Sequence, residues 1–229
     1  MSAEESGAGV KTVYGGPVST ASVLVAGRPL VLVRPAEPDR MLADPEVIAW
    51  NRRDDYMPYW AYLWPGAVLL AEAVAAEPWV TGGPALEIGC GLGLAGLAAL
   101  GRGLSVCFSD YDEAALGFAA RSAAANGFDP ASYTTRRLDW RAPPDERFAV
   151  ILGADVLYES RLVPLVAGLL DAMLAPGGLA LIAGPYRVPA EGFAPEVAAR
   201  GLSCEAVAVS AESADLGPVR GTLHRVRRP

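Results

Sequence analysis

Four acidic side chains stand at the ends of short apolar segments in the middle of this 229-residue chain. They are Glu87, Asp110, Asp139 and Asp155. If those segments are parallel strands, their carboxyl ends meet at one edge of a sheet, where α/β proteins bind their ligands. Carboxylates gathered there can accept hydrogen bonds from hydroxyl groups and attract cations. We therefore expect a ligand site built around these acids.

A glycine-rich turn follows the first of these segments. A strand expected at Ala85 to Ile88 runs into Gly89-Cys90-Gly91-Leu92-Gly93, and an alanine- and leucine-rich helix follows from Leu94 to Leu100. Glycine lets the backbone approach a ligand closely, and the helix N-terminus points its free N–H groups toward it. This strand, turn and helix predict the first unit of a nucleotide-binding α/β domain.

The turn fits two binding motifs. Gly91-x-Gly93-x-x-Gly96 matches a dinucleotide fingerprint, with Asp110 about where the ribose-binding acid is expected. Glu87-x-Gly89-x-Gly91-x-Gly93 instead resembles motif I of the class I S-adenosylmethionine (SAM) methyltransferases. SAM carries a sulfonium and an ammonium but no phosphate, so the carboxylate of Glu87 favours SAM and would repel a pyrophosphate. The alternative is that Glu87 is only a solvated carboxylate at the end of a strand.

Composition and charge narrow the classes of function. Hydrophobic residues make up 52% of the chain and charged residues 20%, which is typical of a globular α/β domain. The net charge of −7 argues against a nucleic-acid partner bound through its phosphates. Cys90, Cys107 and Cys204 form no Cys-x-x-Cys pair, and His224 is the only histidine, so we expect no disulfide framework and no metal site.

The sequence predicts neither a signal peptide nor a membrane-spanning segment. Met1 to Ser6 is acidic and has no apolar signal segment, and the longest uncharged apolar run, Ile88 to Gly101, is too short to span a bilayer. We expect a cytoplasmic protein that is monomeric and does not bind membranes.

The remaining elements predict an N-terminal appendage followed by an alternating α/β domain. Residues 1–55 contain a hairpin signal, with Val23 to Val25 and Leu30 to Val33 on either side of Ala26-Gly27-Arg28-Pro29. Residues 56–229 are expected to form the ligand-binding domain, with a short or weak helix between its third and fourth strands. Further strands are expected at 104–110, 133–138, 148–155, 179–183, 203–209 and 221–225, and helices at 46–50, 67–76, 114–126, 162–174 and 193–200.

The order of motifs over about residues 56–228 resembles the seven-β-strand SAM methyltransferases. Three stretches are similar to the family-16 lysine methyltransferase-like group, namely Pro58-Tyr59-Trp60-Ala61-Tyr62-Leu63-Trp64-Pro65-Gly66, Leu138-Asp139-Trp140 and Gly153-Ala154-Asp155-Val156-Leu157-Tyr158. The first resembles the corresponding segment of the electron-transfer-flavoprotein β-subunit lysine methyltransferases. The resemblance implies an α/β fold, a doubly wound Rossmann-like seven-stranded sheet with a hairpin appendage. It also implies SAM as cofactor, S-adenosylhomocysteine (SAH) as product and N-methylation of a protein lysine.

The resemblance also implies residue roles. The residues implied to bind the cofactor are Trp60, Trp64, Glu87, Gly89, Gly91, Gly93, Asp110, Tyr111, Asp139, Trp140 and Ala154. Glu87 and the glycines would hold the methionine end, Asp110 would bind the ribose, and Tyr111, Asp139 and Trp140 would surround the adenine. Trp60 or Trp64 would close over the cofactor.

Asp155 and Tyr158 would be catalytic, at the point where methyl donor and acceptor meet. Asp155 would orient the amine, with proton acceptance as a further possibility, and Tyr158 would add a hydrogen bond or an aromatic face. The alternative is an acid that starts a helix, followed by a packed tyrosine.

Other functions stay open. Gly184-Pro185-Tyr186-Arg187 stands where members similar to the flavoprotein enzymes often carry Asp-Pro-Gly-Arg, so the acceptor could be a small molecule methylated at nitrogen or oxygen. An NAD-dependent oxidoreductase is disfavoured by Glu87 and by the lack of a Tyr-x-x-x-Lys pair, because Lys11 is the only lysine. A SAM-binding protein without catalysis is a further alternative.

Overall fold

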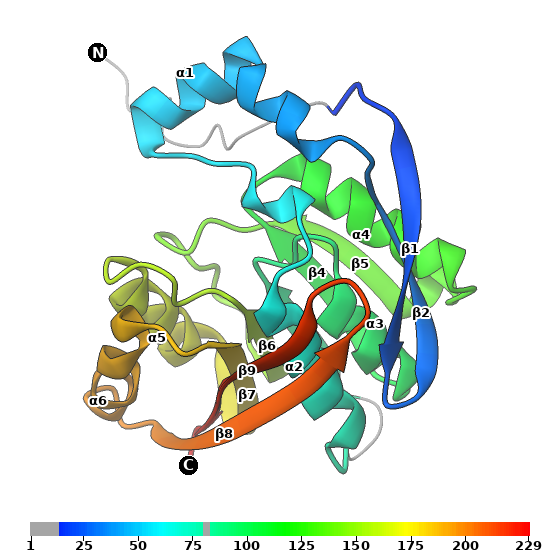
Figure 1. The fold of residues 1–229 in the computed structure, drawn as a ribbon. Coiled ribbons are helices and arrows are strands. Elements are labelled where there is room, and N and C mark those ends of the chain that lie inside the picture. The colour runs from blue at the N-terminus through cyan, green and yellow to red at the C-terminus, as the bar shows by residue number, and fades with distance from the viewer. Residues whose placement is uncertain (1–13, 80–82) are drawn as a thin grey trace.

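The computed structural model describes residues 14–79 and 83–229, and its centre is a seven-stranded sheet in the order β5-β4-β3-β6-β7-β9-β8 (Figure 1). The strands are β3 (Pro84–Ile88), β4 (Ser105–Asp110), β5 (Tyr133–Arg137), β6 (Phe148–Ala154), β7 (Leu174–Pro185), β8 (Ser203–Ser213) and β9 (Gly217–Arg227). Strands β3 to β7 pair in parallel, and β9 pairs antiparallel with both β7 and β8. The chain moves outward from β3 to β5 and then returns to β6, so the strand order reverses between β3 and β6, where such sheets bind ligands.

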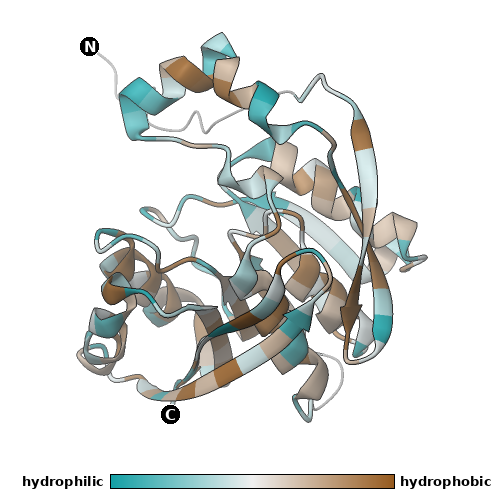
Figure 2. Cartoon of the chain, in the orientation of Figure 1, coloured by the Kyte–Doolittle hydropathy of each residue, from teal (hydrophilic) through white to brown (hydrophobic). Residues whose placement is uncertain are grey.

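Helices cover both faces of the sheet. They are α2 (Pro65–Ala76), α3 (Leu94–Gly101), α4 (Glu113–Ala125), α5 (Leu162–Met173) and α6 (Phe193–Ala198), whereas α1 (Pro45–Asp54) lies away from the sheet (Figure 1). Alternate residues of a strand point to opposite faces, and β6 divides accordingly. Val150 and Leu152 belong to the core that includes α2, α3 and α4, whereas Ile151 belongs to the core under α5 and α6. Figure 2 shows apolar residues concentrated on the central strands and the helices next to them.

The predicted hairpin is formed by β1 (Val18–Val25) and β2 (Arg28–Pro35). Its two-residue turn places Ala26 and Gly27 at φ of +48° and +76°, the left-handed conformation that matches strand twist in tight hairpins. β2 is fastened to α4, because the Val33 N–H donates to Ser122 Oγ at 2.9 Å and the Val31 N–H donates to Asn126 Oδ1 at 2.9 Å. The hairpin therefore shares its packing with the sheet domain.

The prediction of a short helix between β5 and β6 is wrong, because residues 138–147 form turns, bends and irregular backbone but no helix. Asp139 Oδ1 accepts a hydrogen bond from the Arg141 N–H at 2.9 Å and so closes a local turn. Pro143 and Pro144 follow, and proline disfavours helix in the residue before it. Within the described residues, no helix has the length and apolar character needed to cross a membrane.

Candidate active site

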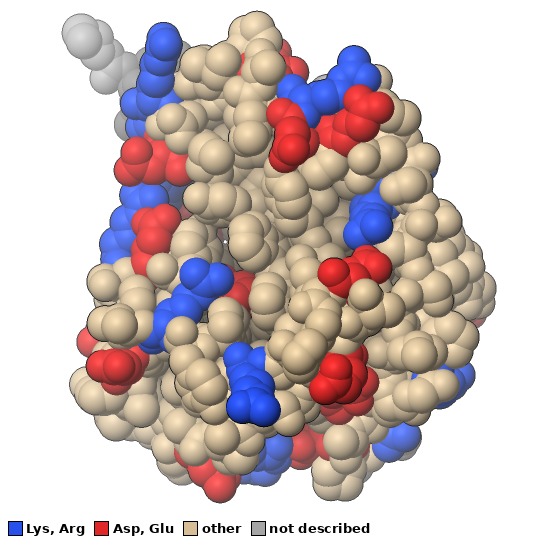
Figure 3. All heavy atoms as spheres, in the orientation of Figure 1, with Lys and Arg blue, Asp and Glu red and all other residues tan. Residues whose placement is uncertain are grey.

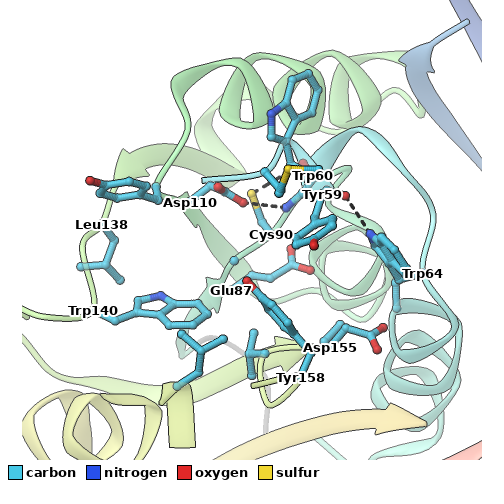
Figure 4. A pocket seen from close by; sticks show the side chains of 18 of the residues that line it. Tyr59, Trp60, Trp64, Glu87, Cys90, Asp110, Leu138, Trp140, Asp155 and Tyr158 are labelled. Carbon is cyan, nitrogen blue, oxygen red and sulfur yellow. Dashed lines mark hydrogen bonds between the residues drawn. The ribbon is translucent and has the colours of Figure 1, made fainter. Parts of the chain in front are cut away.

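The carboxyl ends of β3, β4 and β6 surround a cavity of about 540 Å³, a size suited to a small organic ligand. Every residue that the sequence predicted for the site lines this cavity: Trp60, Trp64, Glu87, Gly89, Gly91, Gly93, Asp110, Tyr111, Asp139, Trp140, Ala154, Asp155 and Tyr158. Figure 4 shows Trp140 and Tyr158 across the cavity from Asp110 and Trp60. The structure therefore brings together residues that are almost 100 positions apart in the chain.

The turn after β3 requires glycine. Gly89 and Gly91 have φ of +58° and +51°, a conformation that side chains with a Cβ rarely adopt. A Cβ at Gly89 would also lie 3.1 Å from the Trp140 ring, and one at Gly91 would lie 3.4 Å from the Trp60 carbonyl oxygen. The turn is thus held between two aromatic segments, and its bare backbone forms one wall of the cavity.

Glu87 is buried below this turn, with 2% of its surface exposed, which excludes the solvated-edge alternative. Its Oε2 accepts a hydrogen bond from the Gly96 N–H at 3.0 Å, at the N-terminus of α3. Burial raises the pKa of Glu87 to about 8, although the N–H groups of Gly96 and Ala95 act in the opposite direction. A cation bound in the cavity would favour the ionised carboxylate.

Asp110 holds the other side of the turn. Its Oδ2 accepts from the Gly91 N–H at 2.9 Å and its Oδ1 accepts from the Asp112 N–H at 3.0 Å. Burial raises the pKa of Asp110 to about 6, against the effect of these two N–H groups. Because a carboxylate oxygen has more than one lone pair, both oxygens can still accept hydroxyl groups from a ligand.

Asp112, two residues further along the chain, has a different task. Its Oδ1 accepts from the Ala114 N–H at 2.9 Å and caps α4, and its Oδ2 accepts from the Trp60 indole N–H at 2.9 Å and from the Tyr56 hydroxyl. The Trp60 ring is 6% exposed and packs against Phe118 with ring centroids 5.4 Å apart. Trp60 therefore anchors the aromatic segment in the core, with its backbone beside the cavity.

Trp64 is more open than Trp60. Its indole N–H donates to the Tyr59 carbonyl at 2.7 Å, and its ring meets the Tyr59 ring edge-on at 5.7 Å (Figure 4). The Tyr59 ring in turn contacts Tyr158 edge-on, with centroids 5.7 Å apart. Burial raises the pKa of Tyr158 to about 12, so its hydroxyl stays protonated and can donate. These rings form a continuous aromatic wall on the side of Asp155.

Arg141 organises the rim of the cavity and was missed by the sequence analysis. It donates to both oxygens of Asp139, at 2.9 and 3.0 Å from Nε, and this bonding lowers the pKa of Asp139. It also donates to Asp54, the last residue of α1, at 3.0 Å and to the Tyr111 hydroxyl at 2.9 Å. Asp139 is thus committed to Arg141, and α1 is tied to the cavity rim.

Asp155 differs from the other acids because its bonding is incomplete. Its backbone is left-handed, with φ of +54°, which is uncommon outside glycine and typical of functional sites. Oδ2 accepts from the Gly66 N–H at 2.6 Å, whereas buried Oδ1 has no hydrogen-bond partner among the described residues. The nearest cation is that of Arg187, whose Nη2 lies 3.8 Å from Oδ1. Burial raises the pKa of Asp155 to about 6, against the effects of Gly66 and Arg187.

Gly66 is a further functional residue that the sequence analysis did not single out, although it ends the quoted aromatic stretch. A Cβ at Gly66 would overlap Asp155 Oδ2 and lie 2.9 Å from the Ala183 carbonyl oxygen. Only glycine therefore lets the start of α2 approach Asp155 closely enough to hold its carboxylate.

Comparisons with known proteins show the family and the fold of this chain. The lysine methyltransferase family model matches residues 61–191. The electron transfer flavoprotein beta subunit lysine methyltransferase of Xenopus laevis is 26% identical over 149 residues, which cover 62% of this chain and 60% of that protein. The chain thus matches less than two thirds of the length of that relative.

Solved methyltransferases share the fold at low sequence identity. The ribosomal protein L11 methylase of Lactobacillus delbrueckii subsp. bulgaricus has a TM-score of 0.56 and 19% identity, covering 70% of this chain and 78% of that one. The T. thermophilus 16S rRNA N2 G1207 methyltransferase, solved with AdoMet and guanosine, has a TM-score of 0.58 and 17% identity, covering 92% and 51%. The Synechocystis magnesium protoporphyrin IX methyltransferase, solved with SAH, has a TM-score of 0.56 and 16% identity, covering 71% and 84%.

The fold is that of the solved methyltransferases, and the family that matches the chain implies SAM as the methyl donor. The chain belongs to the lysine methyltransferase family. Both the α/β fold and the resemblance to the family-16 group are confirmed.

Proposed function

We propose that this enzyme transfers a methyl group from SAM to the side-chain amine of a protein lysine. The observation that carries the proposal is Asp155, a largely buried carboxylate beside the cofactor cavity whose Oδ1 has no hydrogen-bond partner among the described residues. The lysine methyltransferase family and the Xenopus relative support the choice of lysine as acceptor.

The residues of the cavity fit SAM. Glu87 supplies a buried carboxylate for a cationic ligand, the backbone of Gly89 and Gly91 allows close approach, and Asp110 can accept ribose hydroxyls. The Trp140 ring provides a flat apolar wall for the adenine. When bound, SAM supplies an electrophilic methyl group on a positively charged sulfur. The protein then has mainly to align the donor with the acceptor.

Asp155 orients the acceptor. With a pKa near 6 it is ionised at neutral pH, and Oδ1 can accept a hydrogen bond from an amine. Its charge raises the pKa of a nearby amine, whereas burial of the amine lowers it. Because lysine has an ordinary pKa of about 10.4, a carboxylate of pKa 6 is a weak base for its proton. The ammonium must lose its proton to solvent before methyl transfer, because only the free amine has a lone pair, and positioning is therefore the main role that we assign to Asp155.

The aromatic wall supports a cationic acceptor. Tyr59, Trp64 and Tyr158 present ring edges and faces beside Asp155, and aromatic faces attract alkylammonium groups. The protonated Tyr158 hydroxyl can also donate a hydrogen bond.

The rim near Asp155 favours a protein acceptor over a small one. Tyr186 and Val188 follow β7 and are 64% and 78% exposed, so the loop that would have to enclose a small acceptor leaves large apolar side chains in solvent. Such exposed side chains are available for contact with a protein surface.

The first test separates cofactor binding from methyl transfer. Calorimetric titration with SAH, and with NADH as the parallel ligand, should give micromolar binding of SAH alone. A screen of cell extract with labelled SAM should then place the label in protease-sensitive material. Binding of NADH alone would overturn the proposal, and label that survives protease in a small molecule would overturn the lysine assignment.

Two matched variants test the residue roles. Asp155→Asn should bind SAH as the wild type does but lose about 100- to 1,000-fold in methyl transfer, the usual range for a lost electrostatic contact in an active site. Asp110→Asn should instead weaken SAH binding by about 10- to 100-fold, because a charged hydrogen bond is lost. Full turnover by Asp155→Asn would contradict its positioning role.

A further inference from the structure

A second cavity of about 460 Å³ adjoins the cofactor cavity. It lies among the end of β7, the short helix η4 (Val188–Gly192), α6 and the strands β8 and β9. Asp155, Tyr158 and Arg187 line both cavities. The two spaces therefore meet at Arg187 and at Asp155 and Tyr158, which are already assigned to the acceptor. Displacement at a methyl group needs donor and acceptor to lie on opposite sides of it.

The orphaned oxygen of Asp155 borders this second cavity. Gly184, which lines the second cavity only, would place a Cβ 3.7 Å from Asp155 Oδ1, an ordinary van der Waals distance, so this wall of the second cavity lies directly beside that oxygen. The Arg187 guanidinium stands 3.8 Å from Oδ1, close enough for charge attraction but too far for a hydrogen bond. Asp155 Oδ1 thus has a cation nearby but no hydrogen-bond donor among the described residues.

The walls of the second cavity suit an apolar stem. They are made largely of small apolar side chains, including Ala183, Pro185, Ala190, Ala194 and Ala206. His224 lies among these walls, and its burial lowers its pKa, so the imidazole is neutral. Glu191 adds a carboxylate to the lining, which favours a cationic ligand. A chain of methylene groups that ends in an ammonium matches this combination.

We propose that the second cavity receives the side chain of the acceptor lysine, and that its ammonium takes the place of the Arg187 guanidinium at Asp155 Oδ1. This inference rests on the proposed function and specifies the route by which the acceptor approaches. Tyr186 and Val188, exposed at this cavity, contact the polypeptide on either side of the lysine. Arg187 balances the buried carboxylate until the acceptor arrives.

The test uses the full chain saturated with SAH and two small probes. Nα-acetyl-lysine N-methylamide carries the lysine stem and ammonium, and Nα-acetyl-norleucine N-methylamide carries a stem without the charge. NMR or calorimetric titration should show binding of the lysine probe and weaker binding of the norleucine probe. Equal binding of both, or binding of neither, would overturn the inference.

Gly184→Ala tests the location. Its Cβ meets no atom closer than 3.7 Å, so the fold and SAH binding should be retained, while the methyl group fills the space beside Asp155 Oδ1. The lysine probe should bind about 10-fold more weakly, in line with the cost of overfilling a packed site. Gly117→Ala is the control, because a Cβ there meets nothing within 4 Å. Unchanged probe binding by Gly184→Ala would place the acceptor elsewhere and leave the proposed function standing if labelled SAM still modifies protein.

Arg187→Gln tests the displacement. Removal of the competing cation should tighten binding of the lysine probe by about 2- to 5-fold, the scale of a partly exposed ion pair. Arg220→Gln removes a charge that lines neither cavity and should leave probe binding unchanged. Weaker binding of the probe by Arg187→Gln would show that Arg187 holds the acceptor instead of yielding to it, and would overturn this part of the inference.

Discussion

The cofactor side and the proposed acceptor side of the active site differ in how completely the protein's own groups satisfy their carboxylates. On the cofactor side, Glu87 and Asp110 accept hydrogen bonds from backbone N–H groups of Gly96, Gly91 and Asp112. On the acceptor side, the described residues satisfy only one oxygen of Asp155, whose backbone conformation is left-handed. A buried polar atom without a partner is costly, and a role in catalysis or binding is one of the explanations for it. On the roles proposed above, the cofactor half is preformed, whereas the acceptor half has a carboxylate oxygen that its substrate would satisfy.

The difference follows from local structure. Glu87 and Asp110 lie beside a glycine turn and a helix N-terminus, which offer free N–H groups to any nearby carboxylate. Asp155 follows β6 without such a turn, and its side chain depends on the N–H groups at the start of α2, a distant part of the chain. One half is thus built by neighbours in sequence and the other by a tertiary contact.

Gly66→Ala breaks the acceptor half and gives the largest expected effect. The new Cβ would overlap Asp155 Oδ2 and push the carboxylate away from the Gly66 N–H. Misplacement of a catalytic group by about 1 Å costs roughly 100-fold in rate. We expect at least that loss in methyl transfer measured with labelled SAM, with SAH affinity within about 3-fold of the wild type.

Gly96→Ala is the matched change in the cofactor half. Its Cβ would overlap the buried Phe108 ring and would lie 2.5 Å from Glu87 Oε2, so we expect a loss of stability of roughly 1–3 kcal/mol together with weaker SAH binding. If Gly66→Ala weakened SAH binding as much as Gly96→Ala did, the two halves would not be separable. Thermal denaturation and calorimetry of both variants decide between these outcomes.

The pH dependence of stability tests the burial of Glu87 in the cofactor half. The pKa of Glu87 is about 8 in the folded protein against an ordinary 4.5, so folding binds a proton within this interval. The stability that protonated Glu87 contributes is therefore fully present below pH 4.5 and is lost as the pH rises toward 8. Between pH 6.5 and 8.5 we expect the melting temperature of the wild type to fall by roughly 2–5 °C, measured by calorimetry.

Glu87→Gln is the control for this loss. The amide keeps an oxygen for the Gly96 N–H but does not titrate, so the melting temperature should stay nearly constant over the same interval. Asp110 and Asp155 have pKa values near 6 and contribute mainly below this interval, and neutral His224 contributes little above pH 6.5. An equal fall in both proteins would assign the effect to groups other than Glu87.

Much of the cofactor half could be predicted from the sequence, because its contacts are local. Apolar segments that end in acids locate strand ends, and the glycine spacing after β3 marks the turn. The acceptor half was only partly predictable. Asp155 was found from its position after a strand, but its partners are far away in the chain: Gly66 is separated from it by 89 positions.

Other contacts could not be predicted from the sequence because they also join distant parts of the chain. Tyr56 and Asp112 are 56 positions apart and join through a hydroxyl and a carboxylate that each fit simpler local roles. The expected helix before β6 failed because turn bonding by Asp139 and two prolines outweigh the short helical pattern. Charges cannot be assigned to partners by sequence either, and Figure 3 shows acidic and basic side chains interspersed over the face that it displays.

Arg141→Ala tests the rim of the cofactor half and gives the smallest expected effect. Arg141 ties Asp54 of α1 to Asp139 and Tyr111, but its side chain is 50% exposed, and such ion pairs contribute little. We expect the dissociation constant for SAH to rise by about 2- to 5-fold and the turnover number to stay unchanged. Raising the salt concentration should weaken SAH binding by the wild type and have less effect on the variant, because solvent ions screen the pair. Arg200→Ala, which removes an ion pair with Glu196 on α6, should leave SAH binding as it is. A fall in turnover by Arg141→Ala would mean that α1 also positions the acceptor, and the two halves of the site would then be coupled through its rim.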